Sequence, residues 1–282
     1  MSSPAQPWTS FYPPGVSPAF GPLKYPHLPA AIRDASLTYA QKPAFTLGLP
    51  NGSQGTISFS DVDRLSDQFA VYLREVAGFT AGDRVAIQMP NCLAYPIAVF
   101  GALKAGLIMV NTNPLYTPAE MVHQFNDSGA TGLVVIDLFA GKVAEALPKT
   151  SIRTVIVVSI ADLLPALKRF VIGAVQKYGK KMVPPITFAH TTMRRALGQG
   201  ADRIAAGADP AIYAESLTHD SIAALQYTGG TTGVAKGAVL SHGNLLANTI
   251  QGLDMWRPFL RLGDEVMLTA LPLYHIFAFT AN

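Results

Sequence analysis

A run of glycine and threonine residues that ends at a lysine is the part of this chain best suited to chemistry. With the residues on either side, it comprises Tyr227, Thr228, Gly229, Gly230, Thr231, Thr232, Gly233, Val234, Ala235, Lys236, Gly237 and Ala238. Glycines let backbone N–H groups approach an anion closely, threonine hydroxyls add donors or a metal ligand, and the lysine supplies positive charge. The run therefore indicates a binding site for the phosphates of a nucleotide.

Short apolar segments flank this run, at residues 222–225 and 238–240, and they predict a loop between two strands. A flexible linker is the less favoured interpretation, because linkers rich in Gly, Ser or Thr rarely carry strand-like flanks and a terminal lysine. A Walker-type motif requires Gly-Lys followed by Ser or Thr. Here Lys236 follows Ala235 and precedes Gly237, so the run does not match the common ATPases and GTPases.

The composition limits the class of protein. The chain has 282 residues, enough for one large domain or two smaller ones, and 49% of them are hydrophobic. Charged residues make up only 14%, against about 25% in ordinary globular proteins. This low fraction indicates either contact with a membrane or a fragment whose missing partner covers apolar surface. The net charge of +3 is too small to argue for nucleic-acid binding. The single cysteine, Cys92, cannot form an internal disulfide, which fits a reducing compartment.

The sequence predicts neither a signal peptide nor a transmembrane segment. Residues 1–29 are rich in proline and aromatic residues but lack a basic start followed by an apolar run, so they do not resemble a signal peptide. The longest apolar stretch, residues 89–110, is interrupted by Pro90, Asn91, Pro96 and Lys104. A helix followed by a buried strand explains this stretch better than a transmembrane segment.

Strand and helix patterns alternate from residue 82 onward. Strands are predicted at residues 85–89, 107–110, 132–136 and 154–158, and helices at 93–105, 118–126 and 142–147. Short apolar strands separated by helices are typical of parallel strands covered on both faces. The predicted fold class is α/β.

Residues 163–181 interrupt this alternation with a basic amphipathic pattern. Its apolar members recur at helical spacing and are Leu163, Leu164, Leu167, Phe170, Val171, Ala174, Val175 and Tyr178, and its basic members are Lys168, Arg169, Lys177, Lys180 and Lys181. One interpretation is a helix that rests on an anionic membrane surface. The other is a surface helix packed on its own domain with solvated lysines, and it is favoured because such stripes are common on globular helices.

Residues 226–240 resemble the phosphate-binding motif of the adenylate-forming (AMP-binding) enzymes, which include acyl-CoA synthetases, luciferases and the adenylation domains of peptide synthetases. The common form of that motif has serine at the position of Gly229 and proline at the position of Ala235. The variant present here is similar to that of bacterial long-chain fatty-acid–CoA ligases. Two further stretches, residues 110–118 (VNTNPLYTP) and 271–277 (LPLYHIF), resemble the same branch.

The resemblance extends over residues 26–282 and leaves residues 1–25 as an N-terminal extension. It implies the N-terminal part of the adenylate-forming fold, in which mostly parallel sheets are covered by helices. Relatives of this type are roughly twice as long, beyond the usual size of one domain. We therefore expect a partial N-terminal AMP-binding domain that does not catalyse the full reaction alone. The expected missing parts are a later motif with a magnesium-binding glutamate, an aspartate that holds the ribose, and a C-terminal domain with the adenylation lysine.

The resemblance implies a two-step reaction with ATP, magnesium and CoA. A fatty carboxylate attacks the α-phosphate of ATP to give acyl-adenylate and pyrophosphate, and CoA then displaces AMP to give acyl-CoA. Adenylation gives the carboxylate a good leaving group. Backbone donors, Lys236 and a magnesium ion would stabilise the charge of the departing pyrophosphate.

The resemblance also assigns roles to individual residues of the run. It implies that Thr231 is a magnesium ligand and that Thr228 and Thr232 donate to phosphate oxygens. Each of these threonines could instead only shape the loop, and Lys236 could be a solvated loop lysine.

The resemblance places His275 near the reacting carboxylate, with Tyr274 and Phe277 lining the acyl pocket. From the residues alone, His275 could equally be a hydrogen-bonded core residue. His242 is assigned to a turn between a strand and a helix, with Ser241 as its N-cap.

Two other functions stay open from the sequence. One is an adenylating ligase for a different carboxylate, such as an aryl or medium-chain acid, and the other is a non-catalytic nucleotide-binding fragment. We expect a cytoplasmic protein without nucleic-acid partners, and peripheral contact with the inner face of the membrane stays open, as does the oligomeric state.

Overall fold

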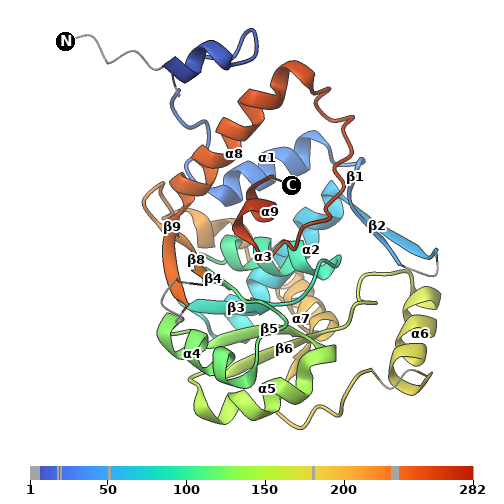
Figure 1. Ribbon diagram of the computed structural model, residues 1–282. Coiled ribbons are helices and arrows are strands. Elements are labelled where there is room, and N and C mark those ends of the chain that lie inside the picture. The colour runs from blue at the N-terminus through green and yellow to red at the C-terminus, as the bar shows by residue number, and fades with distance from the viewer. Residues whose placement is uncertain are drawn as a thin grey trace.

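The computed structural model describes residues 7–17, 19, 21–49, 52–179, 182–229 and 235–281. Within these residues, seven strands form one sheet in the order β7-β6-β5-β3-β4-β8-β9 (Figure 1). The strands are β3 (Arg84–Gln88), β4 (Ile108–Asn111), β5 (Gly132–Ile136), β6 (Thr154–Val158), β7 (Thr191–Thr192), β8 (Ile222–Thr228) and β9 (Lys236–Ser241). All neighbours pair in parallel except β9, which is antiparallel to β8. The predicted α/β class with a mostly parallel sheet is confirmed.

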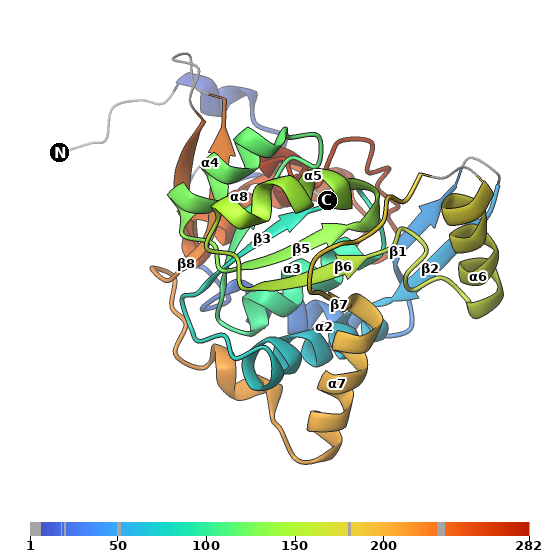
Figure 2. The same ribbon diagram turned by 90° about the horizontal axis from the view of Figure 1, so that it is seen from below.

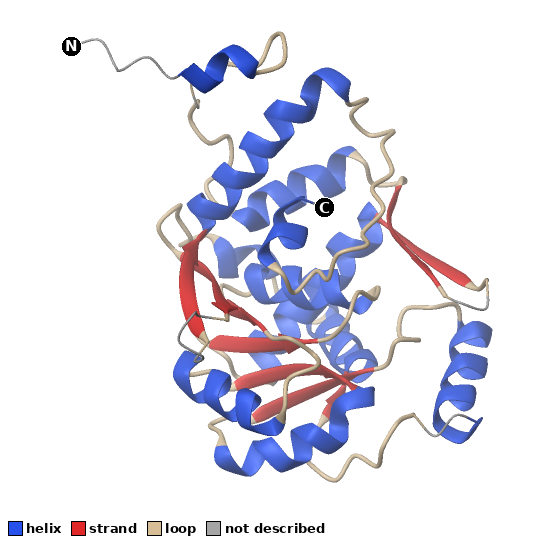
Figure 3. Cartoon of the chain, viewed as in Figure 1, coloured by secondary structure: helices blue, strands red, loops and turns tan. Residues whose placement is uncertain are grey.

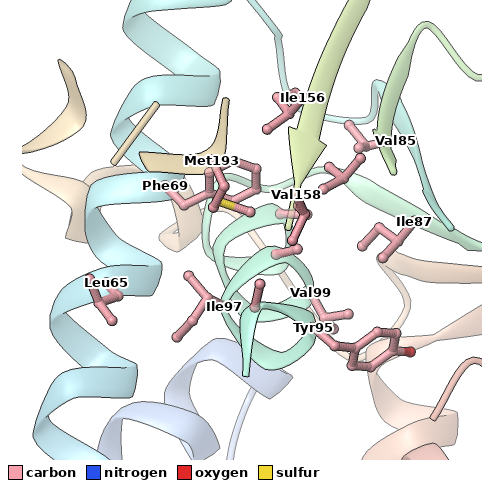
Figure 4. Packing of buried hydrophobic residues seen from close by; sticks show 14 of the residues in the cluster. Leu65, Phe69, Val85, Ile87, Tyr95, Ile97, Val99, Ile156, Val158 and Met193 are labelled. Atoms are coloured by element: carbon pink, nitrogen blue, oxygen red, sulfur yellow. The ribbon is translucent and has the colours of Figure 1, made fainter. Parts of the chain in front are cut away.

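Helices cover both faces of this sheet. The sheet separates two hydrophobic clusters, one under each layer of helices. On one face lie α2 (Phe59–Val71), α3 (Ala94–Lys104) and α7 (Met193–Ala205), and on the other α4 (Pro118–Ser128) and α5 (Ala140–Ala146) (Figure 2). Neighbouring strand residues point to opposite faces, so Val85 and Ile87 of β3 pack in the first cluster and Ala86 in the second. Figure 4 shows the first cluster, where Ile156 and Val158 lie beside side chains of the covering helices.

The remaining elements surround this core (Figure 3). A separate antiparallel pair is formed by β1 (Pro43–Gly48) and β2 (Gln54–Ser58). The other α-helices are α1 (Leu28–Thr38), α6 (Ala166–Ala174), α8 (His242–Trp256) and α9 (Ile276–Ala281). Short 3₁₀ or π segments are Pro7–Phe11, Tyr72–Val76, Asp137–Phe139, Leu147–Lys149, Val175–Gly179, Pro210–Ala214 and Arg257–Phe259.

The strands and helices predicted between residues 82 and 158 are present to within a few residues. Strands β5 and β6 have the predicted bounds, and the apolar stretch 89–110 forms α3 and most of β4. In the part of the chain that the structure describes, no helix has the length and apolar character needed to cross a membrane. Helix α4 shows why its prediction succeeds. Thr117 and Glu120 form a capping box at its start, and Gly129 ends it with a left-handed φ of 65°.

The basic amphipathic segment differs from the favoured interpretation. Its helix, α6, begins at Ala166, after Leu163 with a φ of 67° and Pro165, and not at residue 163. Leu164 is buried in the core, but Leu167 and Phe170 are 76% and 75% exposed. Leu163 and Ile172 are partly buried against the core, so the segment packs on its own domain through only part of its apolar stripe. The helix contacts the neighbouring β1–β2 hairpin through Lys168, whose Nζ donates to the Gln54 carbonyl oxygen at 2.8 Å.

A buried histidine at the start of α8 contacts the start of α1. As predicted, His242 begins this helix and Ser241 is its N-cap, in a capping box with Asn244. The Nδ1 atom of His242 accepts a hydrogen bond of 3.3 Å from the Leu28 backbone N–H. His242 is 1% exposed. Burial, with a smaller effect of the neighbouring His27, lowers its pKa from 6.5 to about 4.

This buried histidine predicts a loss of stability in acid. Between pH 6.5 and about 4 the unfolded chain binds a proton that the folded chain does not. As the pH is lowered through this range, the free energy of unfolding therefore decreases by about 3 kcal/mol from this group. His242→Asn keeps an acceptor for the Leu28 N–H but cannot titrate. Urea unfolding at pH 7 and pH 4 should show a loss smaller by about that amount in the variant. An equal loss in both chains would contradict this role.

Candidate functional site

The β8–β9 hairpin holds the two ends of the glycine-threonine run. Thr228 pairs with Lys236 and Tyr227 with Gly237. A side chain at Gly237 would bring its Cβ within 2.9 Å of the Tyr227 ring, which explains why glycine stands there. Thr228, Gly229 and Lys236 are exposed, as is Ala238 further along β9. The predicted loop between two strands is confirmed, and both of its ends present polar groups at the surface.

The middle of the run, from Gly230 through Thr231, Thr232 and Gly233 to Val234, lies outside the described residues. The roles assigned to Thr231 and Thr232 therefore stay predictions. Among the residues that the structure does describe, no three His, Cys, Asp or Glu side chains gather to hold a metal ion. A magnesium ion bound largely through substrate phosphates needs only one or two protein ligands.

Two buried amide side chains lie next to each other at the carboxyl ends of β4 and β8. Asn111 and Gln226 are register partners on these strands, and they are 2% and 5% exposed. Asn111 Nδ2 donates to Gln226 Oε1 at 3.2 Å, and Gln226 Nε2 donates to the carbonyl oxygen of Tyr274 at 3.2 Å. Buried amides need such partners, because each unpaired group would cost its lost hydration. The amide pair therefore fixes the backbone beside His275.

Asn91 and Tyr95 hold the preceding part of that segment. Asn91 Nδ2 donates to the carbonyl oxygens of Thr269 and Leu271 at 3.1 and 2.9 Å, and its Oδ1 accepts from the Leu273 N–H at 2.8 Å. The Tyr95 hydroxyl lies 2.9 Å from Asn111 Oδ1 and 2.8 Å from the Leu273 carbonyl oxygen. Burial raises the pKa of Tyr95, so the hydroxyl keeps its proton and donates.

These bonds bring together the three stretches that carry the sequence resemblance. Residues 110–118 contribute Asn111, residues 226–240 contribute Gln226, and residues 271–277 contribute the carbonyl of Tyr274. Parallel sheets bind ligands at the carboxyl ends of their strands, and this convergence lies at that edge. The sequence pattern missed Asn91 and Tyr95, which carry no recognisable spacing relative to residues some 180 positions later.

His275 lies where the held segment turns into α9. Its side chain is exposed, so it is not a buried core histidine, and its carbonyl accepts from the Phe279 N–H at 3.0 Å. Tyr274 is half-buried, and Phe277 is 62% exposed. A small cavity of about 100 Å³ lies nearby, lined by Leu28, Phe45, Tyr95, Pro96, Phe100, Leu245, Thr249, Leu273, Phe279 and Thr280. The lining of the cavity includes none of these three predicted residues.

Helix α4 contacts both ends of the loop, a feature that the sequence reasoning missed. The Nε2 atom of His123 lies 3.1 Å from the carbonyl oxygen of Ala235. The hydroxyl of Tyr227 donates to Asp127 Oδ2 at 2.5 Å. Burial, and then the hydrogen bond to Asp127, raises the pKa of Tyr227. No sequence pattern marks these contacts, because the partner of His123 is a backbone carbonyl and Asp127 follows the predicted helix 118–126.

The bonds of Asn91 predict a measurable change in the segment before His275. Asn91→Ala removes three hydrogen bonds, so amide hydrogen exchange at residues 271–274 should rise at least about tenfold. Asn126→Ala is the control, because Asn126 donates only to the carbonyl of Lys149, away from this segment. Exchange of the Leu273 amide at the same rate in both variants would show that Asn91 does not hold the segment.

The arrangement agrees with comparisons to known proteins. Residues 32–282 match the family model of the AMP-binding enzymes. The long-chain-fatty-acid–CoA ligases of Salmonella typhimurium and Haemophilus influenzae are 42% and 39% identical to the chain over 276 and 280 residues, covering 98% of the chain and 47% of each relative. A crystal structure of a long-chain-fatty-acid–CoA ligase from Archaeoglobus fulgidus superimposes with a TM-score of 0.66 at 20% identity, covering 96% of this chain and 47% of that one. The chain thus spans about half the length of the curated relatives it matches, and it belongs to the family of AMP-binding enzymes.

Proposed function

We propose that the protein carrying this chain is a long-chain fatty-acid–CoA ligase. The single observation that carries the proposal is the convergence of the three motif stretches at the carboxyl ends of β4 and β8, beside the loop between β8 and β9. Identity of about 40% to ligases of this type supports the choice of substrate. The substrates are a long-chain fatty acid, ATP and CoA.

The proposed reaction activates a carboxylate, which is otherwise a poor electrophile. A carboxylate oxygen bonds to the α-phosphorus of ATP while the bond from that phosphorus to the pyrophosphate oxygen breaks. The sulfur of CoA then bonds to the acyl carbon, the bond to AMP breaks, and the thiol proton passes to a base. Lys236, exposed at the start of β9, and the backbone N–H groups of the loop take up the charge of the pyrophosphate.

The remaining site residues have proposed roles around this reaction. Thr228 and Thr232 donate to phosphate oxygens, and Thr231 holds a magnesium ion, which neutralises phosphate charge when it is bound. His275 orients the fatty carboxylate, and Tyr274 and Phe277 lie at the entrance for the acyl chain. The segment that presents them is fixed by Asn91 and Gln226, which supports a role in positioning.

The substrate class is tested with the gene product that carries this sequence. Thioester formation from palmitate, octanoate and benzoate, with ATP and CoA, should be fastest for palmitate. Preference for benzoate or octanoate would favour an adenylating ligase for another carboxylate. Binding of ATP without thioester formation from any acid would favour a non-catalytic nucleotide-binding protein.

Lys236 provides the sharpest test of the phosphate site. Lys236→Ala in the 282-residue chain should weaken binding of magnesium-ATP by about 10- to 100-fold, the value of one hydrogen bond to a charged group. Titration calorimetry measures this affinity. Lys149→Ala is the matched control, since Lys149 is also an exposed lysine but follows α5. Equal affinity in the two variants would show that Lys236 does not bind the phosphates of ATP.

We also propose peripheral contact between α6 and the inner face of an anionic membrane, which would place the protein at the cytoplasmic side. The support is the exposure of Leu167, Phe170 and Val171, at 76%, 75% and 49%. Residues 163–181 carry five lysines and arginines and no aspartate or glutamate. Such a helix gains apolar burial from the lipid and attraction from anionic headgroups.

This contact predicts charge-dependent sedimentation with vesicles. Lys177, Lys180 and Lys181 changed together to Glu should reduce co-sedimentation with vesicles of phosphatidylserine and phosphatidylcholine by at least about tenfold, at about 1 kcal/mol per charge. The control reverses three exposed basic residues elsewhere, Lys149, Arg195 and Arg203, with the same change in net charge. The membrane proposal fails if both triple variants sediment equally.

A further inference from the structure

One helix contacts the phosphate loop at both of its ends. His123 lies 3.1 Å from the Ala235 carbonyl at the far end, and Asp127 accepts from the Tyr227 hydroxyl at the near end. His123 and Asp127 are four residues apart on α4, so they lie one turn apart on the same face of the helix. One face of α4 thus contacts both Tyr227 and Ala235, the residues at the two ends of the loop.

The chemistry of the two contacts fixes their direction. A carbonyl oxygen can only accept, so the Nε2 atom of His123 carries the proton and donates to Ala235. Burial keeps the Tyr227 hydroxyl protonated, so it donates to the Asp127 carboxylate. The helix therefore donates at one end of the loop and accepts at the other, and neither contact can be replaced by the other.

The helix that makes these contacts is itself immobilised against the sheet. Met121 and Phe125 are fully buried in the second hydrophobic cluster. Gln124 Nε2 donates to the carbonyl oxygen of Asn111 at 3.0 Å. Thr117 and Glu120 cap the start of the helix reciprocally. The positions of His123 and Asp127 are therefore set by the core and not by the loop.

We infer that His123 and Asp127 are positioning residues that hold Tyr227 and Ala235, at the two ends of the loop, in place before the nucleotide binds. This inference rests on the proposed role of the loop in binding phosphates. A loop of glycines and threonines loses conformational freedom when it binds an anion, and contacts that restrict it beforehand reduce that loss. Neither side chain needs to touch the nucleotide, so both act through Tyr227 and Ala235.

Calorimetric titration of magnesium-ATP and of inorganic pyrophosphate into the 282-residue chain tests the inference. His123→Ala and Tyr227→Phe should each weaken both probes roughly 5- to 30-fold. His123→Gln, whose amide N–H can donate to the same carbonyl, and Asp127→Asn, which keeps an acceptor, should bind within about threefold of the unaltered chain. Asn126→Ala, on a neighbouring position of α4 but bonded to Lys149, is the control.

Thermal unfolding and amide exchange of each variant separate positioning from simple stability. The inference predicts faster exchange near residues 228 and 235–236 in His123→Ala, with an unfolding midpoint like that of Asn126→Ala. Unweakened binding in His123→Ala and Tyr227→Phe would overturn the inference while leaving the proposed function intact. A parallel loss of global stability, or no rescue by His123→Gln and Asp127→Asn, would also overturn it. Failure of the unaltered chain to bind ATP would overturn the nucleotide site itself, and the inference with it.

Discussion

Two buried amides that must find hydrogen-bond partners, Asn111 and Gln226, determine how the site is put together. They lie on neighbouring parallel strands, where water cannot reach them, and each uses the other as a partner. The Nε2 group of Gln226 donates to the carbonyl oxygen of Tyr274, almost fifty residues later in the chain. An amide deprived of these bonds would cost about 1–3 kcal/mol. The path of the segment before His275 is therefore a consequence of polar groups buried at the sheet edge.

Around these amides, the sheet and its helices form a frame that holds the two ends of the glycine-threonine run. The hairpin fixes the loop ends by backbone pairing, and α4 contacts Tyr227 and Ala235 from the side. Stabilisation of a departing pyrophosphate depends on donors that are already oriented before charge develops. We propose that the glycine-threonine run supplies such donors and that the neighbouring elements orient them. The arrangement divides these two tasks between the loop and the frame.

The sequence predicts most of the frame because its apolar strands and helix caps are local signals. The bounds of β5 and β6 and the capped ends of α4 follow from residues within each element. The strand order and the antiparallel pairing of β9 do not, since they depend on contacts between distant segments. The stripe of α6 shows the same limit. Its periodicity predicts an amphipathic helix, but the pattern does not identify what the apolar face contacts, and in the structure Phe170 is exposed.

The site was predicted through its motifs, and the residues that hold the motifs in place were not. Asn91 and His123 have no signature in the sequence, because their partners are backbone carbonyls that any residue could supply. The most direct test of the central claim is a crystal structure of the chain with a non-hydrolysable ATP analogue. The account predicts that its β- and γ-phosphates lie against the backbone between Thr228 and Lys236. Phosphates bound elsewhere, such as in the cavity of about 830 Å³ lined by Asp137, Ser159 and Arg194, would contradict it.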